Sequence, residues 1–222
     1  MALVLKVEDI WKAYPGSDVL RGCGVSFDRL GVYVLMGPNG SGKSTFLRLC
    51  ALLEEPDRGK IDYLSDGQNL AKDIALKRRI TLVLPKAGIF NSSVFGNMAY
   101  GLKVRGVNRG EVAERVDRCL ELFGLAGKKE QNALTLSSGE GQRLSIARAV
   151  VTGPEILFLD EPTASVDQKN SEMIEDFILG MKKQGGLTVV MTTHDASQAA
   201  RLADVRLMIR EGRVVPTPHA ET

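Results

Sequence analysis

The strongest constraint on this chain is an apolar run at residues 32–36 that is followed at once by a polar, glycine-rich turn. The two segments read Val32-Tyr33-Val34-Leu35-Met36 and Gly37-Pro38-Asn39-Gly40-Ser41-Gly42-Lys43-Ser44-Thr45. A strand, a glycine-rich turn and a helix start, in this order, are the setting in which G-x-x-x-x-G-K-[S/T] binds phosphate. An ordinary turn has no need for a Lys-Ser pair at its end. The sequence therefore predicts a nucleoside triphosphate site on residues 37–45.

The residue types of this turn suit phosphate chemistry. Gly37, Gly40 and Gly42 allow the backbone to curl so that consecutive N–H groups point at phosphate oxygens. A helix that starts near Lys43 adds the positive end of its dipole. We expect Lys43 to reach the β- and γ-phosphates and the Ser44 hydroxyl to bind Mg²⁺.

Composition narrows the class of protein. The 222 residues suffice for one α/β core with an insertion, and 29 Lys and Arg nearly balance 27 Asp and Glu, so charge does not favour a nucleic-acid partner. Cys23, Cys50 and Cys119 stand apart in apolar surroundings, which favours reduced core thiols. No apolar stretch approaches the roughly 20 residues of a membrane span, and residues 1–6 lack the layout of a signal peptide. We therefore expect a cytoplasmic protein, and any membrane role then depends on a partner.

Alternating strands and helices predict an α/β fold with a mainly parallel, three-layer core. Strand character is expected at residues 3–7, 24–36, 80–84, 155–159, 187–192, 205–209 and 213–215. Helical character is expected at about residues 43–53, 171–183 and 196–203. Because the first two strand segments flank a turn at residues 14–18, we expect the chain to open with an antiparallel β layer.

Residues 97–148 differ from the rest because they show only helical periodicity. The periodicity is broken at Gly106, Gly110, Gly124 and Gly127. We interpret this stretch as an all-helical subdomain inserted between two core strands. In a single domain, residues 1–85 and 149–215 would form the core, residues 86–148 the insertion, and residues 216–222 a disordered tail.

Two further segments carry polar groups where a ligand could meet them. In residues 156–161, four apolar residues precede Asp160 and Glu161, which predicts a buried strand that presents carboxylates at its carboxyl end. Asp160 is placed to hold Mg²⁺ through water, and Glu161 to orient or deprotonate a water molecule that attacks the γ-phosphate. In residues 136–149, Ser137, Ser138 and Gly139 open a helix, whose free N–H groups and dipole predict a second anion site.

Together these segments resemble the nucleotide-binding subunit of an ATP-binding cassette (ABC) transporter over essentially the whole chain. The resemblance is specific because several motifs occur in the order typical of that family. They are the phosphate loop, the signature Leu136-Ser137-Ser138-Gly139-Glu140, the Asp160-Glu161 strand, the loop Ala164-Ser165-Val166-Asp167, and His194 in Thr192-Thr193-His194-Asp195. The resemblance implies a P-loop NTPase core, ATP and Mg²⁺ as cofactors, and ATP hydrolysis.

The resemblance also implies a homodimer in the ATP-bound state, in which each ATP lies between the phosphate loop of one copy and the signature of the other. Ser137 and Gly139 would then contact the γ-phosphate across the interface, as hydroxyl and N–H donors can. His194 would hydrogen-bond the γ-phosphate and help hold the water beside Glu161.

The resemblance implies two further roles, one for Tyr14 and one for Asp167. Tyr14 would stack on adenine through its aromatic face, whereas Trp11 is better assigned to packing. Asp167 would link the two ATP sites, although an acid at that place also suits the N-terminus of a helix.

The sequence departs from the family at two positions. Ser138 stands where a second glycine is usual, which is a mild change because Ser137 and Gly139 remain. Pro85 stands where the family places a glutamine that touches Mg²⁺ and the attacking water, and proline has no side-chain donor or acceptor. Either Lys86 or another group compensates, or the ATP site is looser and less tightly coupled than usual.

The resemblance favours an energy-coupling ATPase subunit bound to a membrane permease at the inner face of the cell membrane. Residues 90–103 look like the coupling region of bacterial oxyanion importers of the tungstate, molybdate or phosphate kind, which implies a solute-binding protein as a further partner. An exporter or a lipoprotein-release ATPase remains an alternative. A non-transport ABC ATPase that acts as a dimerisation switch is disfavoured by the absence of coiled-coil insertions, and a small-molecule kinase would not explain the signature or His194.

Overall fold

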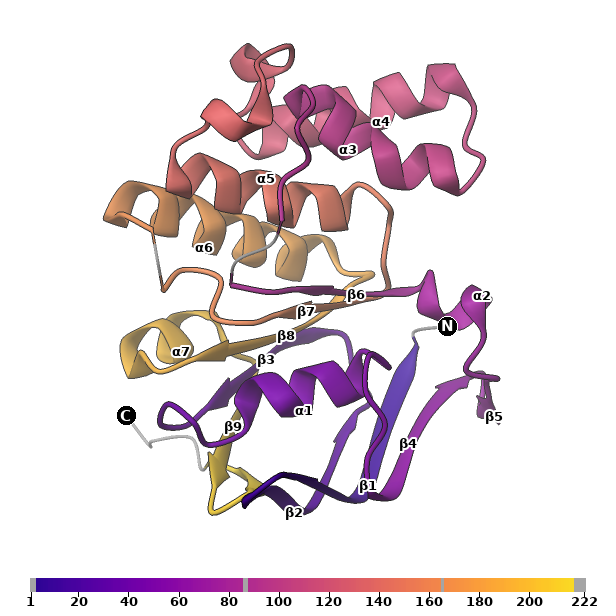
Figure 1. Ribbon diagram of the computed structural model, residues 1–222, viewed down its shortest axis with the longest axis vertical. Coiled ribbons are helices and arrows are strands. Elements are labelled where there is room, and N and C mark those ends of the chain that lie inside the picture. Colours follow the sequence, from indigo (N-terminus) through magenta and orange to yellow (C-terminus); the bar gives the residue numbers. More distant parts are fainter. Residues whose placement is uncertain (1–2, 86–87, 165, 218–222) are drawn as a thin grey trace.

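The computed structural model describes residues 3–85, 88–164 and 166–217, which form two β-sheets and a set of helices (Figure 1). The strands are β1 (Val4–Tyr14), β2 (Ser17–Phe27), β3 (Gly31–Met36), β4 (Arg58–Ser65), β5 (Gln68–Asn69), β6 (Ile80–Val83), β7 (Ile156–Leu159), β8 (Thr188–Thr193), β9 (Val205–Arg210) and β10 (Arg213–Pro216). The α-helices are α1 (Lys43–Cys50), α2 (Ile74–Lys77), α3 (Val94–Val104), α4 (Arg109–Leu122), α5 (Ser138–Val150), α6 (Gln168–Gln184) and α7 (Ala196–Leu202). Short 3₁₀ turns occur at Ala126–Lys128 and Ala133–Thr135.

The two sheets have different strand directions. One sheet has the order β2-β1-β4-β5 with antiparallel neighbours, and the other has the order β10-β9-β3-β8-β7-β6. In the second sheet, β6, β7, β8, β3 and β9 pair in parallel, and β10 pairs antiparallel with β9. The α/β fold with a mainly parallel sheet and an N-terminal antiparallel layer is thus confirmed.

Strands β3, β7 and β8, at the centre of the parallel sheet, are buried on both faces, as the apolar sequences of β3 and β7 predict. Because successive side chains of a strand point to opposite faces, β3 contributes Val32 and Val34 to one core cluster and Tyr33 and Leu35 to the other. The first cluster lies under α3 to α7, and the second is shared with α1 and the antiparallel sheet. The parallel sheet is therefore the middle layer of the molecule.

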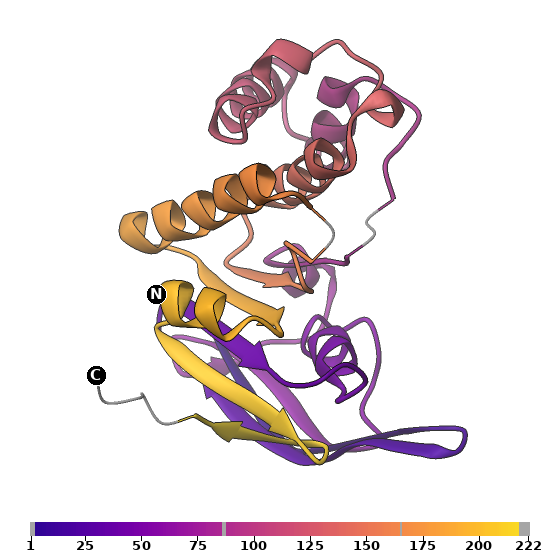
Figure 2. The same ribbon diagram turned by 90° about the vertical axis from the view of Figure 1, so that its left-hand side faces the viewer.

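The chain places several helix N-termini on one side of the molecule. Helices α3, α4 and α5 follow one another between β6 and β7, and α3 and α4 lie at the end farthest from the antiparallel sheet (Figure 1). The N-termini of α1, α5 and α6 lie on the left-hand side of that view, which faces the viewer in Figure 2. The phosphate loop and the signature segment therefore open toward the same side of the molecule.

The structure corrects several expected boundaries. Strand β4 was not expected, because its charged residues conceal the buried pair Ile61 and Tyr63. Gly110 lies inside α4 rather than at a break, since Asn108, two residues earlier, caps that helix. Pro216, expected in a disordered tail, ends β10, whose antiparallel pairing with β9 extends to this residue. Lys86, Ser165 and residues 218–222, on which some of the predictions fall, lie outside the described residues.

Two expectations about composition hold for the described residues. Cys23, Cys50 and Cys119 are buried and free, as core thiols should be, and burial raises the pKa of Cys119 to about 12. No described helix combines the length and the apolar character that crossing a bilayer requires.

Candidate nucleotide-binding site

The phosphate loop joins the carboxyl end of β3 to the first turn of α1. Gly42 is the N-cap residue of α1, and its φ of 100° is a left-handed conformation that favours glycine. At Gly37, φ is 152°, and an added Cβ would lie 2.6 Å from Ile209 Cγ2 and 2.8 Å from the Ile209 carbonyl oxygen. Both glycines of the sequence motif are therefore required by the local geometry.

Lys43 is folded back onto the loop that carries it. Its ammonium group donates to the carbonyl oxygens of Gly37 and Pro38 at 2.8 and 3.2 Å, and lies 3.3 Å from Glu161 Oε1. Only 5% of the Lys43 side chain is exposed. A buried ammonium needs such partners because desolvation disfavours an unpaired charge.

Glu161 is brought to Lys43 by an unusual backbone conformation. Its φ is 44°, which costs a non-glycine residue roughly 1–2 kcal/mol. The Thr192 hydroxyl accepts a hydrogen bond from the Glu161 N–H at 2.8 Å and donates to Asp160 Oδ1 at 2.8 Å, so β8 stabilises the turn that follows β7. Glu161 Oε2 lies 3.5 Å from His194 Nδ1. The carboxylate thus lies between a buried ammonium and an exposed imidazole.

The residues at this place fit a phosphate and a hard cation. Ser41 Oγ is buried without a hydrogen-bond partner in the described part of the chain, so a donor and acceptor there remains available to a ligand. Asp160 is 2% exposed and, within residues 3–85, 88–164 and 166–217, pairs with no cation. Among the residues that the structure describes, no three His, Cys, Asp or Glu side chains are grouped so that they could hold a metal ion.

Tyr14 lies at the end of β1, close to the start of α1. Its hydroxyl donates to Glu54 Oε2 at 2.5 Å, and 38% of the residue is exposed. The Glu54 hydrogen bond raises the pKa of Tyr14, burial adds to the rise, and a hydrogen bond with Thr45 of α1 opposes it. The aromatic ring is therefore fixed at its polar end, and the Lys12 ammonium lies over it, 5.7 Å from the ring centroid.

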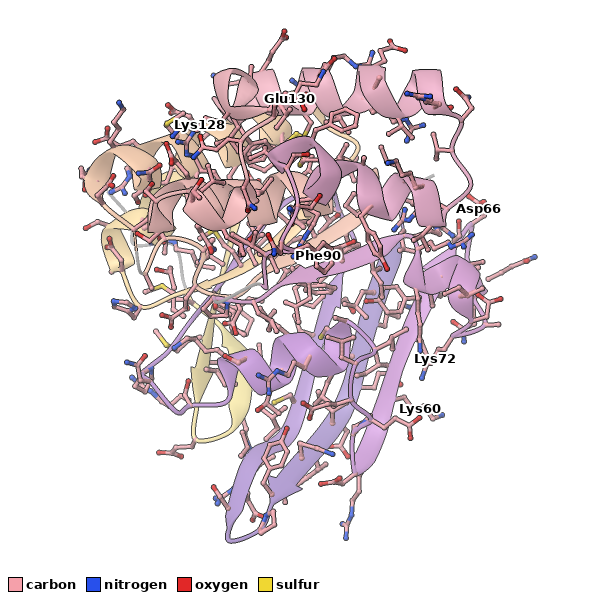
Figure 3. All side chains as sticks on the ribbon, turned by 45° about the horizontal axis from the view of Figure 1, so that its top comes forward. Lys60, Asp66, Lys72, Phe90, Lys128 and Glu130 are labelled. Atoms are coloured by element: carbon pink, nitrogen blue, oxygen red, sulfur yellow. The ribbon has the colours of Figure 1, made fainter. Side chains whose placement is uncertain are left out.

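The signature segment forms the first turn of α5. Ser137 is the N-cap residue of α5. Its Oγ accepts a hydrogen bond from the Glu140 N–H at 3.3 Å, and the Ser137 N–H donates to Glu140 Oε2 at 3.0 Å. These two reciprocal hydrogen bonds form a capping box. Lys128 Nζ lies 2.7 Å from Glu140 Oε1 (Figure 3 labels Lys128). The Lys128 hydrogen bond, followed by the Ser137 N–H, lowers the pKa of Glu140.

Solvent exposure explains why Ser138 is a mild departure from the family pattern. Ser138 is exposed, so its side chain meets no packing constraint, whereas Gly139 is buried. The usual residue type is therefore retained at the position where packing demands it.

Asp167 and His194 occupy ends of secondary structure. Asp167 is the N-cap residue of α6 and accepts from the Asn170 N–H at 2.9 Å, and this hydrogen bond lowers its pKa. The simpler assignment, a helix N-terminal acid, is thus confirmed for Asp167. His194 directly follows β8, and 60% of its side chain is exposed.

The structure places Lys43, Asp160, Glu161 and His194 beside the phosphate loop. The signature segment makes no direct bond to the phosphate loop among the described residues. No hydrogen bond or ion pair among the described residues joins residues 136–140 to residues 37–45. Pro85, Ser137 and Glu161 do line one open cavity of about 330 Å³. Pro85 is therefore close enough to the site for its identity to matter.

Sequence reasoning missed two residues of this region, Thr192 and Asn170. Thr192 was noted only as part of a motif, although a buried polar residue at the end of an apolar strand is a signal that it holds something in place. Asn170 gave no signal, since one of its partners, Arg143, lies on α5, 27 residues earlier in the chain.

Comparison with known proteins identifies the class. The profile of the family described as "ABC transporter" matches residues 20–164. This chain therefore belongs to the ABC transporter family, and it is an ATP-binding domain of that family with ATPase activity.

Individual relatives and a solved structure agree with this assignment. The chain is 37% identical to the phosphate import ATP-binding protein PstB 2 of Natronomonas pharaonis, over 95% of this chain and 78% of that protein. It is 35% identical to the tungstate uptake system ATP-binding protein TupC of Peptoclostridium acidaminophilum, over 95% of this chain and 96% of that protein. The structure of cbiO1 from Clostridium perfringens, part of the ABC transporter complex cbiONQ, superposes with a TM-score of 0.84 at 30% identity, covering 97% of this chain and 88% of that one.

Proposed function

We propose that this chain is the ATP-hydrolysing, energy-coupling subunit of a membrane importer that takes up a small solute such as an oxyanion. The observation that carries the proposal is the cluster of Lys43, Glu161 and His194 at the mouth of the phosphate loop. The direction and the class of solute rest on the relatives named for phosphate import and tungstate uptake.

In this function the phosphate loop binds the triphosphate of ATP. Residues Gly37, Pro38, Asn39, Gly40, Ser41, Gly42, Lys43, Ser44 and Thr45 surround the phosphates, and all of them except Pro38 can offer a backbone N–H group. Tyr14 stacks on the adenine. Lys43 leaves its carbonyl partners and pairs with the β- and γ-phosphate oxygens. Ser44 and Asp160 would hold Mg²⁺, which would neutralise developing charge on the phosphates.

Glu161 and His194 prepare the attack on the γ-phosphate. Once Lys43 has moved to phosphate, the Glu161 carboxylate is free to accept a proton from, or to orient, a water molecule. His194, 3.5 Å from that carboxylate and largely exposed, donates a hydrogen bond to the γ-phosphate. The Thr192 hydroxyl keeps Glu161 in place by holding its N–H.

The site is completed by a second copy of the chain. The N-terminus of α5, which carries Ser137, Ser138, Gly139 and Glu140, lies on the same side of the molecule as the phosphate loop at the N-terminus of α1 (Figures 1 and 2). In a head-to-tail homodimer, the N-terminus of α5 would point at the γ-phosphate held by the partner copy, as helix N-termini point at anions. Asp167, at the N-terminus of α6, would link the two sites.

The proposed permease contact is an exposed aromatic pair. Phe90 and Tyr100 are 45% and 56% exposed, with ring centroids 5.1 Å apart, and the Arg148 guanidinium lies 5.0 Å from the Phe90 ring centroid. Figure 3 labels Phe90, which lies on the segment between β6 and α3. Aromatic residues and arginine are enriched at protein interfaces. Through this contact the subunit would lie on the inner face of the cell membrane, with a solute-binding protein on the other side.

The experiment is recovery of the tagged chain from membranes of the cells that produce it, followed by transport in vesicles. We expect an integral membrane permease to co-purify, and the double substitution Phe90→Ser and Tyr100→Ser to reduce its recovery. Leu53→Ser, which removes an equally exposed apolar side chain elsewhere, is the control. Reconstituted vesicles should take up phosphate, molybdate or tungstate only with ATP on the side of this subunit. ATP-driven release of solute, or co-purification with nucleic acid and no permease, would contradict the proposal.

A further inference from the structure

The amide of Asn170 lies at the centre of a hydrogen-bond network behind the signature segment. Its Nδ2 donates to both carboxylate oxygens of Asp167, at 2.9 and 2.8 Å, while its backbone N–H also donates to Asp167 Oδ1 at 2.9 Å. Its Oδ1 accepts from Arg143 Nε at 2.8 Å. Asn170 is 8% exposed, so its amide is largely removed from water, where hydrogen bonds are stronger and their loss is more costly, whereas Asp167 itself is exposed.

Arg143 extends the network to a third segment. Its Nη1 donates to the carbonyl oxygen of Phe123, at the end of α4, and reaches that of Gly124 at 3.4 Å. Arg143 lies in α5 one turn after Gly139, and it is 6% exposed. A single buried guanidinium and a single amide therefore connect the beginning of α6, the signature helix and the end of α4.

Gly139 packs directly on the same amide. An added Cβ at Gly139 would lie 2.3 Å from Asn170 Nδ2 and 2.4 Å from Asn170 Cγ, far inside contact distance. Asn170 cannot swing away without losing its bonds to Asp167 and Arg143. The glycine of the signature is thus required by close packing against Asn170, since Gly139 has an ordinary helical backbone.

We propose that Asn170 is a positioning residue for ATP hydrolysis, which holds the signature helix and Asp167 in one fixed relation. The proposal rests on the composite site described above, because Ser137 and Gly139 act there on the γ-phosphate of the partner copy. An amide is suited to this place because its two donors match a carboxylate and its acceptor matches a guanidinium. Neither Asp nor Leu offers both halves of this pattern at similar volume.

The test is Asn170→Asp in the full chain, measured by kcat and KM for ATP hydrolysis and by the affinity of a fluorescent ATP analogue. The substitution keeps the acceptor for Arg143, removes the donors to Asp167, and sets two carboxylates against each other. We expect kcat to fall about tenfold. Affinity for the analogue should stay within about twofold, since the phosphate loop is not part of the network. Asn108→Asp is the matched control, because Asn108 is the exposed N-cap residue of α4 and keeps its capping acceptor.

Rescue separates positioning from a general loss of stability. In the double variant Asp167→Asn and Asn170→Asp, the donor and the acceptor exchange places, and we expect at least half of the lost activity to return relative to Asn170→Asp. If Asn170→Asp does not fold, Asn170→Ser serves instead, since its hydroxyl is too short to reach Asp167 and Arg143 together. A parent-like kcat in a folded Asn170 variant, or a double variant no better than Asn170→Asp, would overturn the proposal.

The composite site is tested separately by Ser137→Arg. Loss of hydrolysis in Ser137→Arg with parent-like kcat in Asn170→Asp would overturn the role of Asn170 and leave the composite site standing. Full hydrolysis in Ser137→Arg would remove the composite site, and the role of Asn170 with it.

Discussion

The phosphate loop and the signature segment are both glycine-containing turns at helix N-termini, but their polar groups are satisfied in opposite ways. At the phosphate loop, Lys43 is buried and relies on Glu161 from a different strand, while Ser41 Oγ has no partner among the described residues. At the signature, Ser137 and Glu140 cap one another within a single helix turn. The phosphate loop keeps a polar group that a ligand can satisfy, whereas the signature satisfies its polar groups within its own helix turn.

This difference suggests how the two regions would divide the work. A site with a buried cation and a hydroxyl that has no hydrogen-bond partner can bind an anionic ligand directly, because the ligand supplies the missing counterion and hydrogen bond. A helix start that is already capped gains little from a ligand bound within its own chain. We therefore expect the phosphate loop to set the affinity for ATP and the signature to act mainly on turnover, when a second copy presents it.

The largest effect should come from Glu161→Gln, which keeps the shape of the phosphate-loop cluster and removes its base. We expect kcat to fall about 10²- to 10⁴-fold while ATP binding survives, and the ATP-bound chain should accumulate as a dimer in size-exclusion chromatography. Glu55→Gln, at an exposed acid outside the cluster, is the control. Hydrolysis near the parent rate would show that Glu161 is not the base.

Ser137→Arg tests the other region. We expect it to lower hydrolysis about 10²-fold or more, because an oxyanion donor is lost and a large side chain is placed at the interface. The affinity of the monomer for nucleotide should hardly change. Mixing this variant with Lys43→Ala should restore at most one of the two sites in a dimer, since the other site then carries both lesions. Full activity of dilute, strictly monomeric protein would show that the signature does not act through a second copy of the chain, and the proposed division of roles between the two regions would be wrong.

Pro85→Gln sharpens the comparison at the cavity that the signature segment shares with Glu161. Pro85, Ser137 and Glu161 line it, so a glutamine side chain at residue 85 would meet the attacking water. Positioning groups act on rate more than on affinity, so we expect Mg²⁺-dependent hydrolysis to rise roughly threefold to tenfold with ATP affinity within a few-fold. Lys86→Ala is measured beside it, and a large loss there would show that Lys86 already supplies the missing group. If neither variant changes turnover, this loop does not limit hydrolysis.

The smallest expected effect concerns the charge of the signature cap. Lys128 and the Ser137 N–H lower the pKa of Glu140 in the folded chain, so its ionised form stabilises the fold above the unfolded-state pKa of about 4.3. That contribution is lost as the pH falls through the lowered pKa. Glu140→Gln keeps a capping side chain without the charge, and we expect it to lower the free energy of unfolding by at most about 1 kcal/mol at pH 7. In denaturant titrations the difference should vanish at acidic pH, and a difference that persists there would assign the effect to shape instead.

The sequence predicted those parts of the molecule in which neighbouring residues carry the signal. The phosphate loop, the buried β7 strand and the acids at its end were all found correctly, because apolar runs and glycine turns are local patterns. The start of α1 at Lys43 was also correct, since the turn before it fixes where the helix can begin.

What the sequence could not predict depends on contacts between distant residues. Strand β4 is stabilised by pairing with β1, more than 40 residues earlier, and its own composition is polar. The left-handed backbone of Glu161 depends on a hydroxyl from β8, and one partner of Asn170, Arg143, lies on α5. Such contacts become visible only when the sheet order brings the segments together.

The ion pair between Lys43 and Glu161 should affect the thermal stability of the nucleotide-free protein. The carboxylate neutralises a buried ammonium that would otherwise lie unpaired, so the glutamate serves as a stand-in counterion until phosphate arrives. When ATP binds, a phosphate group replaces the Glu161 carboxylate as the counterion of Lys43. The free energy of ATP binding is therefore reduced by the cost of breaking the ion pair. Glu161→Gln should accordingly melt at a lower temperature than the parent when empty and show the larger rise in melting temperature when ATP is added.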